Sequence, residues 1–142
     1  MLRKSEYLSV FLLGGVLYGC LELLWRGYTH PSMTFAGGLC LLVIHLLNGR
    51  MGRCPFLLRC VLYSLLITAV ELAVGLVVNR WLGLGVWDYS AVPGNVLGQI
   101  CPAFTFLWFL VSIPASFLSG GARRFFDLLS ERERAEERRQ RV

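Results

Sequence analysis

The sequence predicts an all-α, polytopic membrane protein with four transmembrane helices, and three observations support this fold class. Hydrophobic residues make up 56% of the 142 residues and charged residues only 16%, whereas soluble domains average about 45–50% apolar and about 25% charged residues. The mean hydropathy is +0.60. Of the 23 charged residues, 15 lie in residues 1–7 and 119–142. A soluble core of this size would not bury so much apolar surface, so we expect the middle of the chain to lie in a bilayer.

Four apolar stretches are candidates to cross that bilayer, whose hydrocarbon core of about 30 Å takes about 20 helical residues. The first is Leu8–Trp25, and the second, which is shorter, is Met33–Leu47. The third, Pro55–Asn79, begins with a proline, a residue that suits the first turn of a helix. The fourth is Ile100–Leu118.

The segment Arg80–Gln99, between the third and fourth spans, contains three glycines and a further Pro-Gly pair, which prevent a regular helix. It is nevertheless too apolar for a free loop. We expect a re-entrant or interfacial segment that is covered by protein, because exposed irregular backbone is not tolerated in hydrocarbon. The chain then divides into a four-helix transmembrane domain, residues 1–119, and a charged cytoplasmic helical tail, residues 120–142.

The arginines and the one lysine predict the orientation of the four spans. The N-terminus, the 48–54 connection and the C-terminal tail share one side and carry twelve of these cations, counting Arg59 just inside the third span. The other side carries Arg26 and Arg80. Because cytoplasmic loops are enriched in Lys and Arg, both termini are predicted to be cytoplasmic.

Several kinds of chemistry are excluded by composition. The only lysine is Lys4, so there is no phosphate-binding loop and the chain contains no ATPase motif. Without an H-E-x-x-H or C-x-x-C motif we expect no metal site and no cofactor. The tail holds seven arginines against five acidic residues, which is too small an excess for nucleic-acid binding. No enzyme motif is apparent.

Polar residues inside the spans form stripes at helical spacing. On the third span the stripe consists of Cys60, Ser64, Thr68, Glu71, Gly75 and Asn79, and on the first of Gly15, Gly19, Glu22 and Arg26. Residues three and four apart share one helix face. Ionisable groups in hydrocarbon cost about 2.5–3.5 kcal/mol or more, so they normally face a bundle interior or a cavity. Both stripes are therefore expected to face inward.

The outer half of the bundle is the predicted site. Glu71 is the strongest candidate, because an acid in mid-span needs a partner or a proton. Two interpretations stay open: a solvent-open pocket, or a hydrogen-bonded network that only holds the helices together. For His30, a position at the membrane surface is the alternative. The candidate substrate-binding residues are Glu22, Arg26, His30, Glu71, Asn79, Asp88, Tyr89, Asn95 and Gln99.

A distinctive motif lies between the third and fourth spans. It reads Trp87-Asp88-Tyr89-Ser90, then Pro93, Asn95 and Gly98-Gln99-Ile100-Cys101. With Glu22–Gly27, His30, Glu71 and Asn79, it resembles the small bacterial membrane proteins of the ABC-transporter type IV permease family over about residues 10–115. The resemblance implies a multi-pass protein of the bacterial cytoplasmic (inner) membrane. Any ATPase would be a separate subunit.

Three functions remain open at this point. The first is a small permease or transporter subunit for an ion or small solute, in which the membrane acids bind a cation or a proton. Four helices are few for a transporter, so a homo-oligomer or a partner membrane subunit in the lipid bilayer is implied. The second is an intramembrane enzyme or binding protein for a lipid or lipid-linked substrate. The third is a structural or accessory membrane protein.

Overall fold

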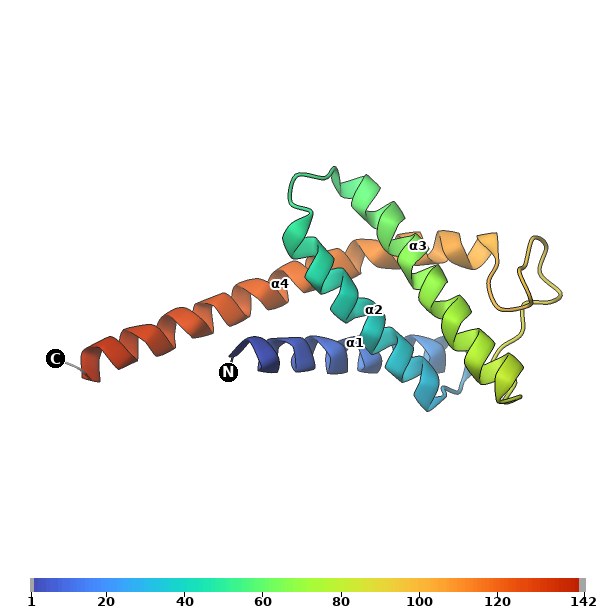
Figure 1. Cartoon of the computed structure of the whole chain (residues 1–142), viewed down its shortest axis with the longest axis horizontal. Coiled ribbons are helices and arrows are strands. Elements are labelled where there is room, and N and C mark those ends of the chain that lie inside the picture. Colours follow the sequence, from blue (N-terminus) through green and yellow to red (C-terminus); the bar gives the residue numbers. More distant parts are fainter. Residues whose placement is uncertain (1, 141–142) are drawn as a thin grey trace.

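The computed structural model describes residues 2–140, with side chains for residues 4–140. Its elements are α1 (Leu2–Arg26), α2 (Pro31–Arg50), α3 (Phe56–Gly75), the π-helical turn η1 (Leu76–Trp81) and α4 (Pro102–Gln140). Figure 1 labels the four α-helices. Within residues 2–140 there is no β-strand, only an isolated bridge between Val96 and Ile100. Four helices in this part of the chain are long and apolar enough to cross a membrane. The predicted all-α fold class is therefore confirmed.

The start of α2 is explained by its local sequence. Pro31 occupies the first position, where its fixed φ suits a helix and its missing N–H leaves no bond unmade. His30 is the residue before it, and its Nδ1 accepts a hydrogen bond from the Ser32 amide at 3.3 Å. The ring therefore caps the helix that follows.

The third membrane helix is longer than α3 alone, because α3 passes directly into η1. In this turn the backbone bonds reach five residues back, as from the Leu82 amide to the Val77 carbonyl at 2.9 Å. The helix consequently ends at Trp81, two residues beyond the predicted Asn79. Isolated π-turns of this kind frequently occur at functional sites.

The fourth membrane helix and the charged tail form one continuous helix. α4 runs for 39 residues and contains Pro114 in its interior. Figure 1 shows its C-terminal part extending well beyond the other three helices. The helix has no break between residues 119 and 120, so the division into a membrane domain and a tail stays a prediction that rests on the change in charge.

Glycines bring α1 and α2 into backbone contact. A Cβ atom added to Gly14 would lie 2.6 Å from the Leu41 Cβ and 2.7 Å from the Gly37 carbonyl oxygen. A Cβ on Gly15 would lie 2.8 Å from the Thr34 carbonyl oxygen, whereas at Gly19 the nearest atom would be 3.5 Å away. Small residues permit this close approach of two membrane helices. On α2, a Cβ on Gly37 would overlap the Tyr18 Cβ, and one on Gly38 would lie 2.7 Å from the Phe11 carbonyl oxygen. The tight packing therefore rests on a pair of glycines from each helix.

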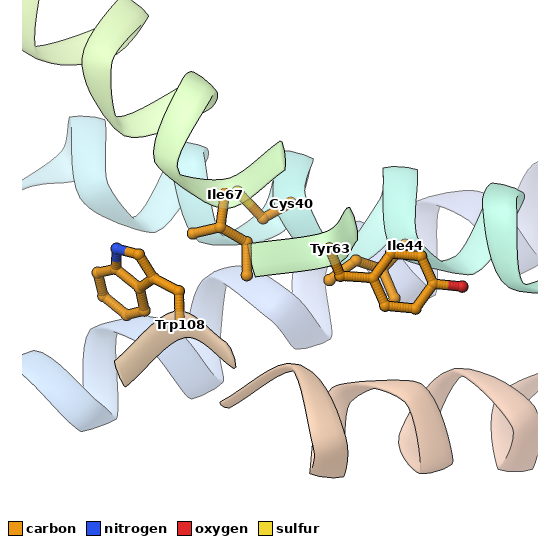
Figure 2. Close-up of a cluster of buried hydrophobic side chains, with 5 residues drawn as sticks. All are labelled: Cys40, Ile44, Tyr63, Ile67 and Trp108. Carbon is orange, nitrogen blue, oxygen red and sulfur yellow. The ribbon is translucent and has the colours of Figure 1, made fainter. Parts of the chain in front are cut away.

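Two groups of buried side chains form the core. The larger group comes from α2, α3 and α4, and Figure 2 shows its members: Cys40, Ile44, Tyr63, Ile67 and Trp108. The smaller group joins α2 and η1 to the segment after them, through Met33, Val78, Val86 and Trp87. Each group thus contains one tryptophan, Trp108 in the larger and Trp87 in the smaller.

The two ends of the bundle differ in structure. We call the end with the 27–30 connection and residues 82–101 the loop end, and the end with both termini the terminal end (Figure 1). Residues 82–101 are irregular, as predicted, and four of their glycines have positive φ, as does Leu97 at 56°. Val86, Trp87, Gln99 and Cys101 are buried in this segment. It therefore folds back against the helices at the loop end.

Candidate functional site

Glu71 lies in the middle of the bundle and is held by two aromatic donors. Its side chain belongs to α3 and the residue is 5% exposed. The Tyr89 hydroxyl donates to its Oε1 at 3.0 Å, and the Trp108 indole donates to its Oε2 at 2.9 Å. Within residues 4–140 no ion pair involves this carboxyl group. Three parts of the chain, α3, residues 82–101 and α4, therefore meet at one acid that has no cationic partner.

Glu22 and Arg26 form an ion pair on α1. The Arg26 Nη2 lies 2.5 Å from the Glu22 Oε1, and the Thr29 hydroxyl donates to Oε2 at 2.6 Å. Arg26 also donates from Nη1 to the Val86 carbonyl at 2.8 Å, which ties α1 to the segment 82–101. The spacing of four residues allowed this pairing along one helix face. The charge of Glu22 is thus compensated within the protein.

Asn79 and Gln99 form a second network that fastens the same segment to η1. The Asn79 amide nitrogen donates to the Gln99 Oε1 at 2.7 Å and to the Trp87 carbonyl at 3.0 Å. Its oxygen accepts from the Val86 amide at 2.7 Å. The Trp87 indole in turn donates to the Gln99 carbonyl at 3.0 Å. The hydrogen bonds of both amide side chains are made to other parts of the protein.

The remaining candidates lie apart from this buried group. Asp88 is exposed and accepts from the Ser90 amide and hydroxyl at 2.8 and 2.5 Å; these bonds hold the pKa of its carboxyl below the ordinary value. Asn95 donates to the Ser90 and Val92 carbonyls and accepts from the Gly98 amide, so it shapes the turns of the segment. His30 caps α2. The structure thus places six of the nine candidates in three hydrogen-bonded groups, around Glu71, Glu22 and Asn79, and leaves these three outside.

A large apolar cavity lies beside Glu71 and between all four helices. Its volume is about 730 Å³. Among the described residues that line it, only Glu71 carries a formal charge. Leu17, Leu21 and Leu24 of α1 and Phe117 of α4 line it and are 42–86% exposed on the bundle surface. The cavity therefore opens sideways, between α1 and α4.

A smaller cavity of about 250 Å³ adjoins the large one at the loop end. Both cavities share five lining residues, and the smaller one adds the Glu22–Arg26 pair, Trp25, Tyr89, Phe104 and Leu107. We call the two together the α1/α4 groove. The shared residues are Tyr18, Leu21, Trp87, Trp108 and Val111.

Aromatic rings surround the carboxyl group in this groove. The centroids of Tyr18 and Trp108 are 5.9 Å apart, and Tyr89 stacks on Phe104 at 4.4 Å with 13° between the planes. Phe104 and Trp108 are 6.3 Å apart. Burial and the nearby carboxylate both raise the pKa of the Tyr89 hydroxyl, which therefore stays protonated and donates to Glu71. The groove thus combines an acid with an aromatic wall.

Tyr18 and Trp108 were not among the candidate residues of the sequence analysis. A signal for Trp108 exists, because it lies at helical spacing between Thr105 and Ser112 on the polar face of α4. Tyr18 gives a similar but weaker signal, because it lies three residues after Gly15 and four before Glu22 on the polar stripe of α1. It lies in an apolar run, and its position in the groove depends on the rotation of α1 about its own axis.

A separate polar cluster joins the helices at the terminal end. His45 is 0% exposed, with Nδ1 3.1 Å from the Ser119 hydroxyl and Nε2 2.9 Å from the Glu6 carboxyl group. Arg123 donates to the His45 carbonyl at 2.7 Å. Neither cavity described above is lined by these residues. The described side chains also include no group of three or more His, Cys, Asp or Glu residues that would hold a metal ion.

These features define a multi-pass α-helical membrane protein with a lateral groove and one unpaired acid within it. The sequence pattern of the family described as "Putative ABC-transporter type IV" matches residues 11–119. The chain belongs to this family, which places it among membrane transport-related proteins. No solved structure matches the chain.

Proposed function

We propose that this protein is a small transporter subunit that receives a hydrophobic molecule from the bilayer through the α1/α4 groove and holds it beside Glu71. The observation that carries this proposal is the apolar cavity of about 730 Å³, which opens sideways between two membrane helices. Cavities that hold small molecules are usually about 300–1,000 Å³ and mostly apolar, with a few convergent polar groups. The groove agrees with each of these properties.

The depth of the cavity within the membrane supports a ligand that enters from the hydrocarbon core of the bilayer. Glu71 precedes Trp81, at the end of the third membrane helix, by ten residues. At about 1.5 Å per residue this is about 15 Å, or half of the roughly 30 Å hydrocarbon core. A ligand beside Glu71 therefore lies at mid-membrane depth, where apolar molecules are soluble.

The polar residues favour an apolar ligand over a hydrated ion. A pathway for a hydrated ion needs polar groups that face water, whereas Glu22 is bonded to Arg26 and Thr29. Asn79 and Gln99 are bonded to each other and to the backbone. The hydrogen bonds of Glu22, Asn79 and Gln99 support a structural role for these three residues. Glu71 is the exception, because it has no ion pair among the described residues.

The proposal includes a setting for the protein. We place it in the bacterial cytoplasmic membrane with both termini in the cytoplasm, as the distribution of arginines predicts. It would act with a second copy or a partner membrane subunit, because four membrane helices are few for a transporter. Any ATPase would be a separate subunit, because the chain has one lysine and no nucleotide-binding loop.

The test is photolabelling of the purified full chain in lipid nanodiscs with a neutral adamantyl diazirine, followed by peptide mass spectrometry. We expect labels on Leu17, Leu21 and Trp108 that decrease in the variant Ala115→Phe, whose larger side chain would fill the cavity that Ala115 lines. Leu65 is 54% exposed on α3 and outside the groove, so its labelling should not change. Equal labelling of the groove in both proteins would contradict the proposal.

A further inference from the structure

The charges that line the α1/α4 groove leave an excess of one acid. Three charged residues of the described chain line it: Glu22, Arg26 and Glu71. Arg26 is paired with Glu22 at 2.5 Å, so their charges compensate each other. Glu71 receives hydrogen bonds from two neutral donors and no ion pair. An ionised Glu71 thus makes the groove negative by one charge.

A single buried carboxylate favours a ligand that brings a positive charge. Moving an ion out of water is expensive unless it is paired, and attraction between opposite charges is stronger where the effective dielectric constant is low. A cation beside Glu71 would therefore bind more tightly than a neutral molecule of the same shape. An ionised Glu71 would repel an anion, and the charge of Arg26 is already compensated by Glu22.

The lining of the groove selects an organic cation over a metal ion. Hard metal ions take six or more oxygen ligands, and the groove offers one unpaired carboxyl group among apolar side chains. Aromatic faces, by contrast, attract organic cations and are used to recognise quaternary ammonium groups. Tyr18, Trp87 and Trp108 line both cavities, and Trp108 is in direct contact with the Glu71 carboxyl group.

We propose that the ligand of the α1/α4 groove is a monovalent hydrophobic cation, such as a quaternary ammonium or phosphonium ion with aromatic or alkyl substituents. Its charged centre lies beside Glu71 and the rings of Tyr18, Trp87 and Trp108, and its apolar substituents fill the cavity. This inference rests on the proposed function, because it names the class of molecule that the groove receives.

Two ions of nearly the same size and opposite charge provide the test. Binding of tetraphenylphosphonium and of tetraphenylborate to the purified full chain is measured by equilibrium dialysis in dodecyl maltoside micelles, with empty micelles subtracted. We expect the phosphonium ion to bind saturably. Its affinity should be about tenfold or more higher than that of the borate ion, because one strong charge contact in a desolvated site contributes about that much. Equal affinities for the two ions would overturn the inference.

The variant Glu71→Gln tests the residue that carries the charge. Its amide oxygen still accepts a hydrogen bond from Tyr89 or Trp108, so the local packing is kept. We expect the phosphonium affinity to fall about tenfold while the control Glu6→Gln, at the terminal end and outside the groove, binds as the wild type does. Unchanged binding by Glu71→Gln would overturn the inference. If that variant does not fold, the comparison of phosphonium and borate binding to the wild-type chain by itself supports or overturns the inference.

The neutral diazirine separates the two proposals. If the diazirine labels the groove and the phosphonium ion does not bind, only the charge preference is wrong. If neither molecule enters the groove, the proposed function is wrong as well.

Discussion

The indole nitrogen of Trp108 lies 2.9 Å from the Oε2 of Glu71, so a hydrogen bond joins α4 to α3 in the middle of the bundle. Trp108 is 7% exposed and Glu71 is 5% exposed. The same indole ring lines both cavities of the α1/α4 groove. One aromatic residue thus positions the acid and forms part of the wall beside it.

Replacing Trp108 with phenylalanine removes the donor and keeps an aromatic ring. We expect the free energy of unfolding to fall by about 1–3 kcal/mol, because the variant leaves one oxygen of a buried acceptor unsatisfied. The midpoint of thermal unfolding in detergent, followed by circular dichroism, measures the change. Trp25→Phe is the matched control, since Trp25 is 77% exposed. Equal losses in the two variants would show that the hydrogen bond is not the cause.

Two glycines of α1 should respond differently to the same substitution. In Gly14→Ala the new methyl group would meet the Leu41 Cβ at 2.6 Å and backbone of α2 at 2.7 Å, so the helices must move apart. Overpacking of this kind typically costs about 1–3 kcal/mol. In Gly19→Ala the nearest atom is 3.5 Å away, and alanine is the better helix former. Chemical unfolding in mixed micelles measures the free energy of unfolding. It should be equal to or higher than that of the wild type in Gly19→Ala and lower in Gly14→Ala.

Loss of the Asn79 side chain should release residues 82–101 from η1. In Asn79→Ala the Val86 amide loses its acceptor, and the Trp87 carbonyl and Gln99 Oε1 lose a donor. Each 1.4 kcal/mol of lost stabilisation is about tenfold in an equilibrium constant, so we expect amide exchange in this segment to accelerate by about tenfold or more. Hydrogen exchange with mass spectrometry measures it. Exchange in α2 should stay as in wild type, and uniform acceleration throughout the bundle would contradict a local role.

The turn at Ser90 should depend on pH only under acidic conditions. Two hydrogen bonds from Ser90 stabilise the ionised Asp88 and hold its pKa below the ordinary value of about 3.9. Because the pKa in the folded protein is the lower one, the stabilisation is complete above the unfolded pKa and is lost as the pH falls through the folded pKa. The ¹³C shift of the Asp88 carboxyl group reports this titration. In Ser90→Ala the midpoint should rise toward 3.9, and an unchanged midpoint would contradict the assignment.

Much of the fold follows from local patterns of the sequence. Pro31 and Pro55 mark the start of two helices, and the glycines after Trp81 mark where regular helix ends, because each residue restricts its own backbone. The end of the third membrane helix was harder to predict from such patterns. Its π-turn includes Asn79, which bonds to residues 82–101, and no local pattern of Leu76–Trp81 reveals either feature.

The candidate site was predicted in part. Helical spacing placed Glu22 beside Arg26 and turned Glu71 inward, and both features occur in the structure. The same reasoning grouped Asp88 with them, although its carboxyl group bonds within its own turn. Spacing describes one helix at a time, so it does not tell whether a residue of an irregular segment faces the helices or the solvent.

The sequence by itself determined that the chain is a helical membrane protein with four spans and an inward polar stripe, because hydropathy and helical periodicity depend only on the order of residues. Only the tertiary structure decided that Glu71 has no cationic partner among the described residues, and that Tyr18, Trp87 and Trp108 line an apolar cavity beside it. Such contacts depend on how far each helix is rotated and how closely it packs. Gly14 and Gly37 allow α1 and α2 to pack with their backbones in close contact. The space between α1 and α4 stays open and forms the groove.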